Sequence, residues 1–263
     1  LLPLLPGPQD ADRPWLICYG IDERVELTGH VLSMWLAKIA GFVTSESVPG
    51  DGVHVALPPH WRSVAWACGT WLAGRSVLLG SNEEIRTAGL IPELSVAFTP
   101  ESLYDEAEAQ ALVPPASLAL RWPEELPALV LDGAADLMHY PDRFTPVSTA
   151  ADSVCLTDLT SEAAAPAAPG APGGTAPSGG RLTVLTRAQL AARVEAADAP
   201  SGSGRHSASR AVLVRSPDTA QMLQEVLVAW RTGRTAVVLT PEAGDDVAAA
   251  AIRQEGIQED ITA

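Results

Sequence analysis

"GDGVHVALPPHWRSVAWACGTWLAGRSVLLG", residues 50–80, is the stretch that decides the fold. Turn residues precede a short apolar run at 52–57 and two prolines follow it, which is typical of a strand. The next run, 60–74, is apolar on nearly every side and ends at Gly74, a residue suited to a helix C-cap. A second apolar run, 75–80, follows directly. The stretch therefore predicts a strand, a buried helix and a second strand.

The same alternation extends along the rest of the chain. An amphipathic helix is expected over residues 27–39, ending near Gly41, because apolar residues recur there at spacings of three and four. Further strands are expected at 94–100, 117–122, 152–158, 181–185, 210–216 and 234–241, and helices at 101–111, 186–197, 217–232 and 245–255. Strands that alternate with helices favour parallel pairing through crossover helices. We therefore expect an α/β fold of mostly parallel sheets flanked by helices.

A low-complexity insert interrupts this pattern. All 18 residues from 163 to 180 are Ala, Pro, Gly, Ser or Thr. Such a composition buries too little apolar area to offset the entropy of ordering the backbone. We predict three parts: a first α/β subdomain over residues 1–158, a flexible Ala/Pro/Gly-rich loop over 159–180, and a second α/β subdomain over 181–263 packed on the first.

The charge balance argues against two classes of partner. The chain has 32 Asp and Glu against 17 Lys and Arg, a net charge of −15. Nucleic acids and anionic membranes are bound through basic surfaces, so neither is expected as a partner. The most apolar stretch, 64–74, falls short of the roughly 20 residues that span a membrane. The first ten residues lack the basic start of a signal peptide.

The cysteines indicate the redox setting. There are three, Cys18, Cys68 and Cys155, and none is part of a paired CxxC spacing. An odd number of widely separated cysteines favours a reducing environment over a disulfide framework. We therefore expect a cytoplasmic protein with free thiols.

Residues 19–80 carry a series of small motifs in a fixed order. They are a Tyr-Gly and Arg-containing strand pair, a helix that opens at Leu-Thr, a Gly-Asp turn, a strand ending in Leu-Pro, and a Trp-containing helix ending in Ala-Gly. The residues concerned are Tyr19, Gly20, Arg24, Leu27, Thr28, Gly50, Asp51, Leu57, Pro58, Trp61, Ala73 and Gly74. In this order and spacing they resemble the opening of the adenylate-forming superfamily of acyl-CoA synthetases, peptide-synthetase adenylation domains and luciferases. The resemblance implies a fold like the first layers of the N-terminal domain of these enzymes.

The junction at residues 156–190 is where the resemblance places a phosphate-binding loop. In those enzymes the loop carries a Ser/Thr-Gly-Ser/Thr cluster and ends in Pro-Lys-Gly. Here the insert follows the hydroxyl residues, and the one lysine of the chain, Lys38, lies far upstream. Hydroxyl and backbone N–H groups are then the remaining hydrogen-bond donors that could hold an anion. The alternative is that this segment is a solvated linker with no binding role. These candidate cofactor-binding residues are Thr160, Ser161, Gly179 and Gly180.

Other parts implied by the resemblance have no match in the sequence. Those enzymes use a Tyr-Gly-x-Thr-Glu loop for adenine and magnesium, an Asp for ribose, and a lysine from a C-terminal domain. Adenylation brings a carboxylate to an anionic triphosphate, so cations must offset the charge at the reacting centre. We therefore expect a truncated, degenerate relative with the N-terminal domain only, no catalytic residues and no metal site. ATP, AMP or CoA is implied by the resemblance alone.

Two further sets of residues are interpreted as structural. Trp61, Trp66 and Trp71 recur every five residues, which scatters them around a helix and indicates core packing. Cys68 lies in the same apolar helix and is expected to be an inert thiol. The histidines show no ligand spacing and are expected at the surface or as helix caps; they are His30, His54, His60, His139 and His206.

The segment "HYPDRF", residues 139–144, combines the most varied side chains of any short stretch. We expect it to form a turn stabilised by Asp142 and Arg143. The alternative is that it lines a cleft.

Three functions are consistent with these observations. The preferred one is a non-catalytic protein that binds a nucleotide, acyl or CoA-like ligand in a cleft at the strand ends. The second is a protein-interaction component that forms a homodimer, because a fold cut short leaves surfaces that need covering. The third is an adenylate-forming enzyme that borrows its cations from a partner chain or a metal.

Overall fold

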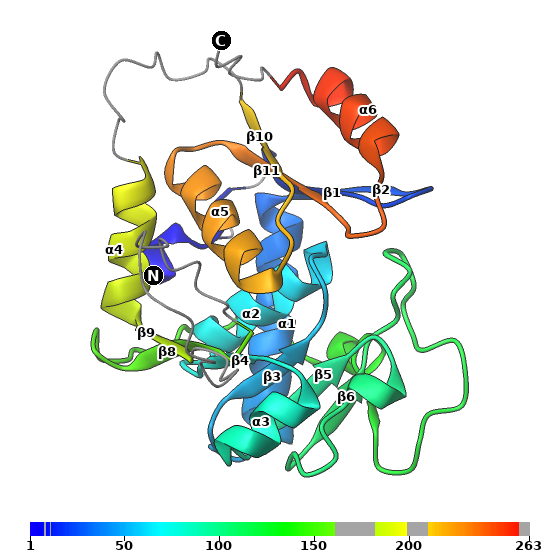
Figure 1. Ribbon diagram of the computed structural model, residues 1–263, viewed down its shortest axis with the longest axis vertical. Helices are drawn as coiled ribbons and strands as arrows, with labels where there is room; N and C mark the ends of the chain where they lie inside the picture. The colour runs from blue at the N-terminus through cyan, green and yellow to red at the C-terminus, as the bar shows by residue number, and fades with distance from the viewer. Residues whose placement is uncertain (8, 11, 161–181, 199–209, 258–263) are drawn as a thin grey trace, which may run out of the picture.

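The structure is a computed structural model that describes the whole chain except residues 8, 11, 161–181, 199–209 and 258–263. It contains two β-sheets stacked with helices between and outside them (Figure 1). The smaller sheet has the strand order β10 (Ala211–Val214), β11 (Thr235–Leu239), β1 (Pro14–Tyr19) and β2 (Arg24–Thr28). Its strands are parallel except for β2, which forms an antiparallel hairpin with β1.

The larger sheet has seven strands. Their order is β7 (Leu131–Asp132), β6 (Gln110–Leu112), β5 (Leu94–Ala97), β3 (Val53–Ala56), β4 (Val77–Leu79), β8 (Val154–Asp158) and β9 (Thr183–Thr186). All neighbours are parallel except β8 and β9. The expected α/β fold of mostly parallel sheets is therefore confirmed.

In the part of the chain that the structure describes, six α-helices complete the layers (Figure 1). Those between the sheets are α1 (Gly29–Glu46), α2 (Trp61–Leu72) and α5 (Thr219–Arg231), with α4 (Arg187–Asp198) beside α5. The outer face of the smaller sheet is covered by α6 (Asp245–Glu255), and that of the larger sheet by α3 (Asn82–Ala88). Short 3-10 turns are η1 (Leu2–Leu4), η2 (Pro100–Ser102) and η3 (Asp136–His139).

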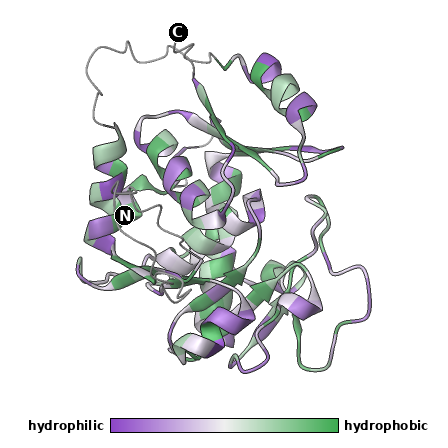
Figure 2. Cartoon of the chain, in the orientation of Figure 1, coloured by the Kyte–Doolittle hydropathy of each residue, from purple (hydrophilic) through white to green (hydrophobic). Residues whose placement is uncertain are grey.

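Alternation along the strands explains the layering. In β1, Leu16 and Cys18 pack toward the central helices, whereas Ile17 and Tyr19 pack toward α6. Successive side chains of a strand point to opposite faces, so a strand with helices on both faces must be apolar at every position. The strands of both sheets are accordingly hydrophobic along most of their length (Figure 2).

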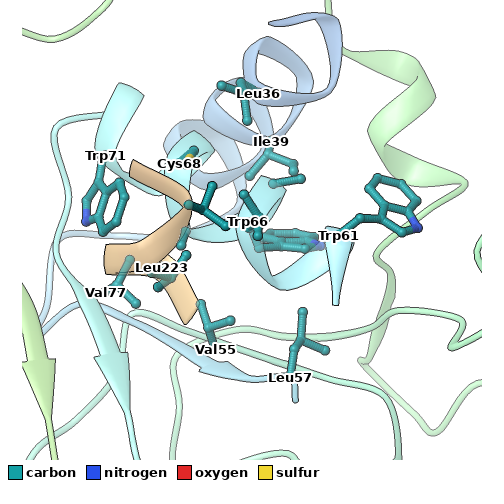
Figure 3. Packing of buried hydrophobic residues seen from close by; sticks show 14 of the residues in the cluster. Leu36, Ile39, Val55, Leu57, Trp61, Trp66, Cys68, Trp71, Val77 and Leu223 are labelled. Atoms are coloured by element: carbon teal, nitrogen blue, oxygen red, sulfur yellow. The ribbon is translucent and has the colours of Figure 1, made fainter. Parts of the chain in front are cut away.

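The centre of the core is α2, which packs against α1, α5 and the larger sheet. Its tryptophans, Trp61, Trp66 and Trp71, are all buried, as predicted, and contact residues from each of these elements (Figure 3). Cys68 is also buried, and burial raises its pKa above the usual range, as expected for an inert thiol. The close approach of α1 to α2 requires Gly69, where a Cβ would lie 2.5 Å from Ile39 Cγ2.

The predicted elements between residues 100 and 130 are wrong. Instead of a helix over 101–111, the chain forms η2, turns and β6, and residues 117–122 form no strand. The Glu and Ala residues of 105–109 favour a helix intrinsically, but parallel pairing of β6 with β5 prevails over this local preference. Long-range pairing thus decides this segment.

One boundary in the N-terminal part also differs from expectation. The first helix does not end near Gly41 but continues to Glu46. Gly41 lies where Tyr140 approaches α1, and a Cβ there would be 2.9 Å from Tyr140 Cδ1. The opening residues form η1 and place Leu5 in the core.

Strand pairing crosses the predicted subdomain boundaries. The hairpin of β1 and β2 joins β10 and β11, whereas β9 joins the sheet that contains β3 to β8. Division of the chain into subdomains at residues 158 and 181 stays a prediction, and the loop predicted for 159–180 lies outside the described residues except for Leu159 and Thr160. Within the described residues, no helix is both long and apolar enough to cross a membrane.

Candidate functional site

A cleft opens where the strands of both sheets end. It has a volume of about 390 Å³ and is lined by five turns, comprising residues 20–23, 58–60, 98, 115–116 and 240–242. These turns follow β1, β3, β5, β6 and β11, so the cleft lies at the carboxyl ends of parallel strands in both sheets. Such edges are the usual place for ligand sites in α/β folds.

The cleft combines apolar walls with acidic side chains. Four prolines, an isoleucine and a phenylalanine form much of the lining: Pro58, Pro59, Pro115, Pro241, Ile21 and Phe98. Three carboxylates also line it, from Asp22, Glu23 and Glu242. Among the described residues that line the cleft, none is Lys or Arg. A negatively charged ligand would therefore meet carboxylates and no cationic side chain among these lining residues.

A buried network joins the two sheets at the base of the cleft. His60 Nδ1 accepts a hydrogen bond from the backbone N–H of Arg62, at 3.1 Å, and caps α2. His60 Nε2 lies 3.2 Å from Ser117 Oγ, which in turn donates to Glu23 Oε1 at 2.7 Å. The backbone N–H of Ser117 donates to Glu23 Oε2 at 3.2 Å. Glu23, from the β1–β2 turn, thus holds the loop after β6.

This network does not form a nucleophile and base pair. Since His60 Nδ1 accepts from a backbone N–H, the proton of the neutral ring sits on Nε2 and is donated to Ser117 Oγ. The Ser117 hydroxyl proton is donated to Glu23. A general base needs a free lone pair directed at the hydroxyl proton, which this arrangement lacks. The cluster therefore stabilises the cleft walls.

His60 should make the protein sensitive to acid. Burial, with a contribution from the charge of Arg62, lowers the pKa of His60 to about 3. A base whose pKa is lowered on folding contributes stability that is complete above its unfolded pKa, about 6.5, and is lost as the pH falls below it. Between pH 7 and pH 5 this loss should be on the order of 2 kcal/mol.

Urea denaturation at pH 7 and pH 5 measures this loss. The variant His60→Gln should lose about 2 kcal/mol less than the parent protein over this range. His30→Gln, which changes an exposed histidine on α1, is the control and should behave as the parent protein. An equal loss in the parent and the His60→Gln variant would show that His60 titrates normally.

Arg62 holds the loop after β6, which forms one wall of the cleft, through hydrogen bonds to its backbone. Its side chain is 2% exposed, and Nη2 donates to the backbone carbonyls of Ala116, Ser117 and Ala119 at 3.3, 3.2 and 2.7 Å. Its guanidinium also lies 4.6 Å from the ring centroid of Trp61. Burial lowers the pKa of Arg62 to about 10, so the group remains charged at neutral pH. That charge is engaged by carbonyl oxygens inside the protein.

The predicted phosphate junction begins after β8, with Thr160 as its one described candidate residue. Asp158 Oδ1 accepts two hydrogen bonds from Thr160, one from its backbone N–H at 2.9 Å and one from its hydroxyl at 2.6 Å. Both donors expected to hold an anion are therefore directed at a carboxylate of the chain itself. The other three candidates, Ser161, Gly179 and Gly180, lie outside the described residues.

A second cavity of about 450 Å³ lies beside this junction, between β8, β9 and α5. Two carboxylates line it, from Asp158 and from Asp218, which caps α5 by accepting from the backbone N–H of Gln221 at 2.8 Å. Arg193 of α4 is the one cationic side chain among its described lining residues. The charges around the cavity therefore do not favour a triphosphate.

The one lysine has a structural role. Lys38 Nζ of α1 donates to the backbone carbonyl of Tyr140 at 2.7 Å and pairs with Asp142 Oδ1 at 2.7 Å. Tyr140 also donates its hydroxyl to Glu46 at the end of α1. The segment at 139–144 is thus held by Lys38 through Asp142, whereas the expectation was a turn stabilised by Asp142 and Arg143.

The histidines divide into three environments. His30 and His139 are exposed and His60 caps α2, as expected. The prediction for His54 is wrong, because this residue is fully buried in β3. Its Nδ1 lies 2.9 Å from Ser95 Oγ, and its Nε2 lies 3.0 Å from the carbonyl oxygen of Gly80. His206 lies outside the described residues. In the part of the chain that the structure describes, no three His, Cys, Asp or Glu residues are grouped to hold a metal ion.

Sequence reasoning missed the residues that build the cleft. Glu23, Ser117 and Arg62 are far apart in the chain, and no motif spacing links them. The carboxylates of the cleft have only an indirect signal in the sequence. Asp22, Glu23 and Glu242 lie at the carboxyl ends of strands that were expected from the sequence pattern or from the family resemblance. Only the pairing order of the sheets brings them together.

No family model matches the chain. A curated protein of Mycobacterium tuberculosis whose name states no activity is 27% identical over 129 residues, which span 47% of this chain and 51% of that relative. Thus only about half of each protein takes part in the match.

Solved structures extend the comparison to nearly the whole chain. An acyl-CoA synthetase of Brucella canis superposes with a TM-score of 0.70 at 17% identity, covering 94% of this chain and 44% of the synthetase. An acetoacetyl-CoA synthetase of Streptomyces lividans gives a TM-score of 0.66 at 16% identity, covering 90% and 37%. An anthranilate CoA ligase in complex with anthranoyl-AMP gives 0.66 at 13%, covering 93% and 45%. This chain therefore spans less than half the length of each.

Proposed function

We propose that this chain, which has the fold of the N-terminal part of acyl-CoA synthetases and related adenylate-forming enzymes, binds a small organic ligand in the cleft at its strand ends without adenylating it. The resemblance expected from residues 19–80 is confirmed at the level of the fold. The observation that carries the proposal is the charge of the cleft, whose lining includes three carboxylates and no Lys or Arg among the described residues.

Electrostatics argue against the nucleotide and CoA alternatives. Both ligands carry several negative charges, which need fixed cations or N–H donors in the site. At the predicted junction, Asp158 already accepts the two donors of Thr160, and Lys38 is paired with Asp142 on α1. The guanidinium of Arg62 is bound to three backbone carbonyls. No cation of this group remains for a polyphosphate.

The same features favour an apolar ligand that is neutral or carries an amine. Apolar walls such as Ile21, Phe98 and Pro115 match a hydrocarbon or aromatic body. Asp22 and Glu242, at the mouth of the cleft, match an ammonium group. A volume of about 390 Å³ suits a ligand of modest size.

A panel of four ligands tests this preference. Hexylamine, hexanol, hexanoate and ATP are titrated into methyl-labelled protein, and the shift of the Ile21 methyl signal reports binding in the cleft. We expect hexylamine to bind tightest there and ATP to cause no saturable shift. In Asp22→Asn/Glu242→Gln, hexylamine should bind about threefold to tenfold more weakly, as for exposed charge pairs.

Asp152→Asn, which changes an exposed carboxylate before β8, is the matched control and should bind hexylamine as the parent protein does. Saturable ATP binding that shifts Ile21, or equal affinities for hexylamine and hexanoate, would contradict the proposal.

A further inference from the structure

A further groove, larger than the cleft at the strand ends, lies between α4, α5 and the edge strand β10. It has a volume of about 560 Å³. Its walls contain the apolar residues Val194 and Ala197 of α4, Val212 of β10 and Val228 of α5. None of these residues lines the cleft at the strand ends, so the two sites are separate.

The charge of this groove is opposite to that of the cleft. Three arginines line it, Arg193 from α4, Arg215 directly after β10, and Arg234 directly before β11, against a single carboxylate, Glu225. The chain as a whole has a net charge of −15, whereas arginines outnumber carboxylates among the residues that line this groove. Such a site attracts an anion rather than an amine.

The one carboxylate is already bound within the protein. Glu225 Oε2 accepts from Ser216 Oγ at 2.5 Å, and its Oε1 accepts from Gln221 Nε2 at 2.7 Å. Both oxygens are thus engaged by α5 and the turn before it. Of the arginines, Arg215 pairs with Asp245 at 2.7 Å through exposed side chains, an interaction that solvent weakens and a ligand anion can share.

Placement of the arginines sets the shape of the ligand. Parallel pairing aligns Ala211 with Thr235 and Val214 with Val238, so Arg234 lies near the start of β10 and Arg215 follows its end. Arg193 lies on the opposite wall, since it belongs to α4 and also lines the cavity beside β8 and β9.

We propose that this groove is a binding site for an amphipathic anion, an apolar body that carries a carboxylate or a phosphate monoester. Arg193 and Arg215 hold the anionic group, and the side chains of Val194, Val212 and Val228 contact the apolar body. Arginine suits this role because its planar guanidinium can bind either oxyanion through two parallel hydrogen bonds.

The test uses four ligands with the same hydrocarbon chain: hexanoate, hexyl phosphate, hexanol and hexylamine. Binding is followed through the methyl signals of Val194 and Val228 in the groove and of Ile21 in the cleft. We expect both anions to shift the groove signals and to bind at least tenfold more tightly there than hexanol. The tighter of the two anions identifies the head group.

Arg193 and Arg215 are exposed, so their substitution should not disturb the folding of the protein. Arg193→Gln/Arg215→Gln should weaken hexyl phosphate binding at least tenfold while leaving the hexylamine shifts of Ile21 unchanged. Arg253→Gln, which removes an exposed charge from α6, is the matched control and should bind as the parent protein does. Equal binding of hexanol and the anions in the groove, or unchanged anion binding in the double variant, would overturn the proposal. Because the two sites report through different methyl groups, failure here is distinct from failure of the cleft.

Discussion

Replacing Arg62 with methionine is expected to lower the free energy of unfolding by about 3 kcal/mol and to release the loop after β6 from the cleft. Methionine keeps most of the side-chain volume but cannot donate to the carbonyls of Ala116, Ser117 and Ala119. Hydrogen bonds from a charged group contribute about 1.5–3 kcal/mol each, and relief from burying the charge offsets part of that loss.

The effect on the cleft separates this role from general packing. Amide exchange of Ser117 should become faster in Arg62→Met, because its loop loses three anchoring hydrogen bonds, and hexylamine should bind more weakly. Arg62→Lys, which retains the charge but not the geometry, should be intermediate. Denaturation in urea measures the stability. A variant with parental stability and parental exchange at Ser117 would show that the loop is held by its other contacts.

Replacing Trp71 with alanine should have a larger effect still, a loss of about 3–5 kcal/mol. Trp71 is fully buried near the end of α2, and its Nε1 donates to the carbonyl of Cys155 on β8 at 2.8 Å. Alanine leaves a cavity between α2 and the larger sheet and also leaves that carbonyl without its donor. Both losses act on the folded state.

Phenylalanine separates the two contributions. Trp71→Phe retains a buried ring and loses the hydrogen bond, so it should cost about 1–3 kcal/mol. Urea unfolding monitored by far-UV circular dichroism avoids dependence on tryptophan fluorescence. If the alanine and phenylalanine variants were equally stable, the cavity would contribute nothing and the packing of α2 described above would be wrong.

The sequence predicts those parts of the fold that carry their own local signal. Residues 53–79 were predicted correctly because β-branched residues, prolines and Gly74 mark each boundary. Residues 100–132 were not, because β6 depends on pairing with β5 and β7 on pairing with β6, and the intrinsic preference of Glu and Ala points to a helix. The pattern of residues along the chain does not show which strands pair with one another in the sheet.

The same distinction applies to the candidate sites. Thr160 was named as a candidate because the family resemblance placed a phosphate-binding loop at this junction, and the structure places it two residues after β8. That its two donors are directed at Asp158, two residues earlier, depends on side-chain geometry that no spacing encodes. Likewise the sequence shows that the loop contains no lysine, but it does not predict that Lys38 pairs with Asp142.

The pairing of β1 with β11 has a consequence for how the protein is made. Residues 14–28 leave the ribosome before their parallel partner at 235–239 has been synthesised. The strands from β3 to β8 can assemble meanwhile, because their partners lie within about a hundred residues. The first hairpin therefore stays apolar and incompletely paired until residues 235–239 have been synthesised, which exposes it to chaperones and to misassembly in the interval.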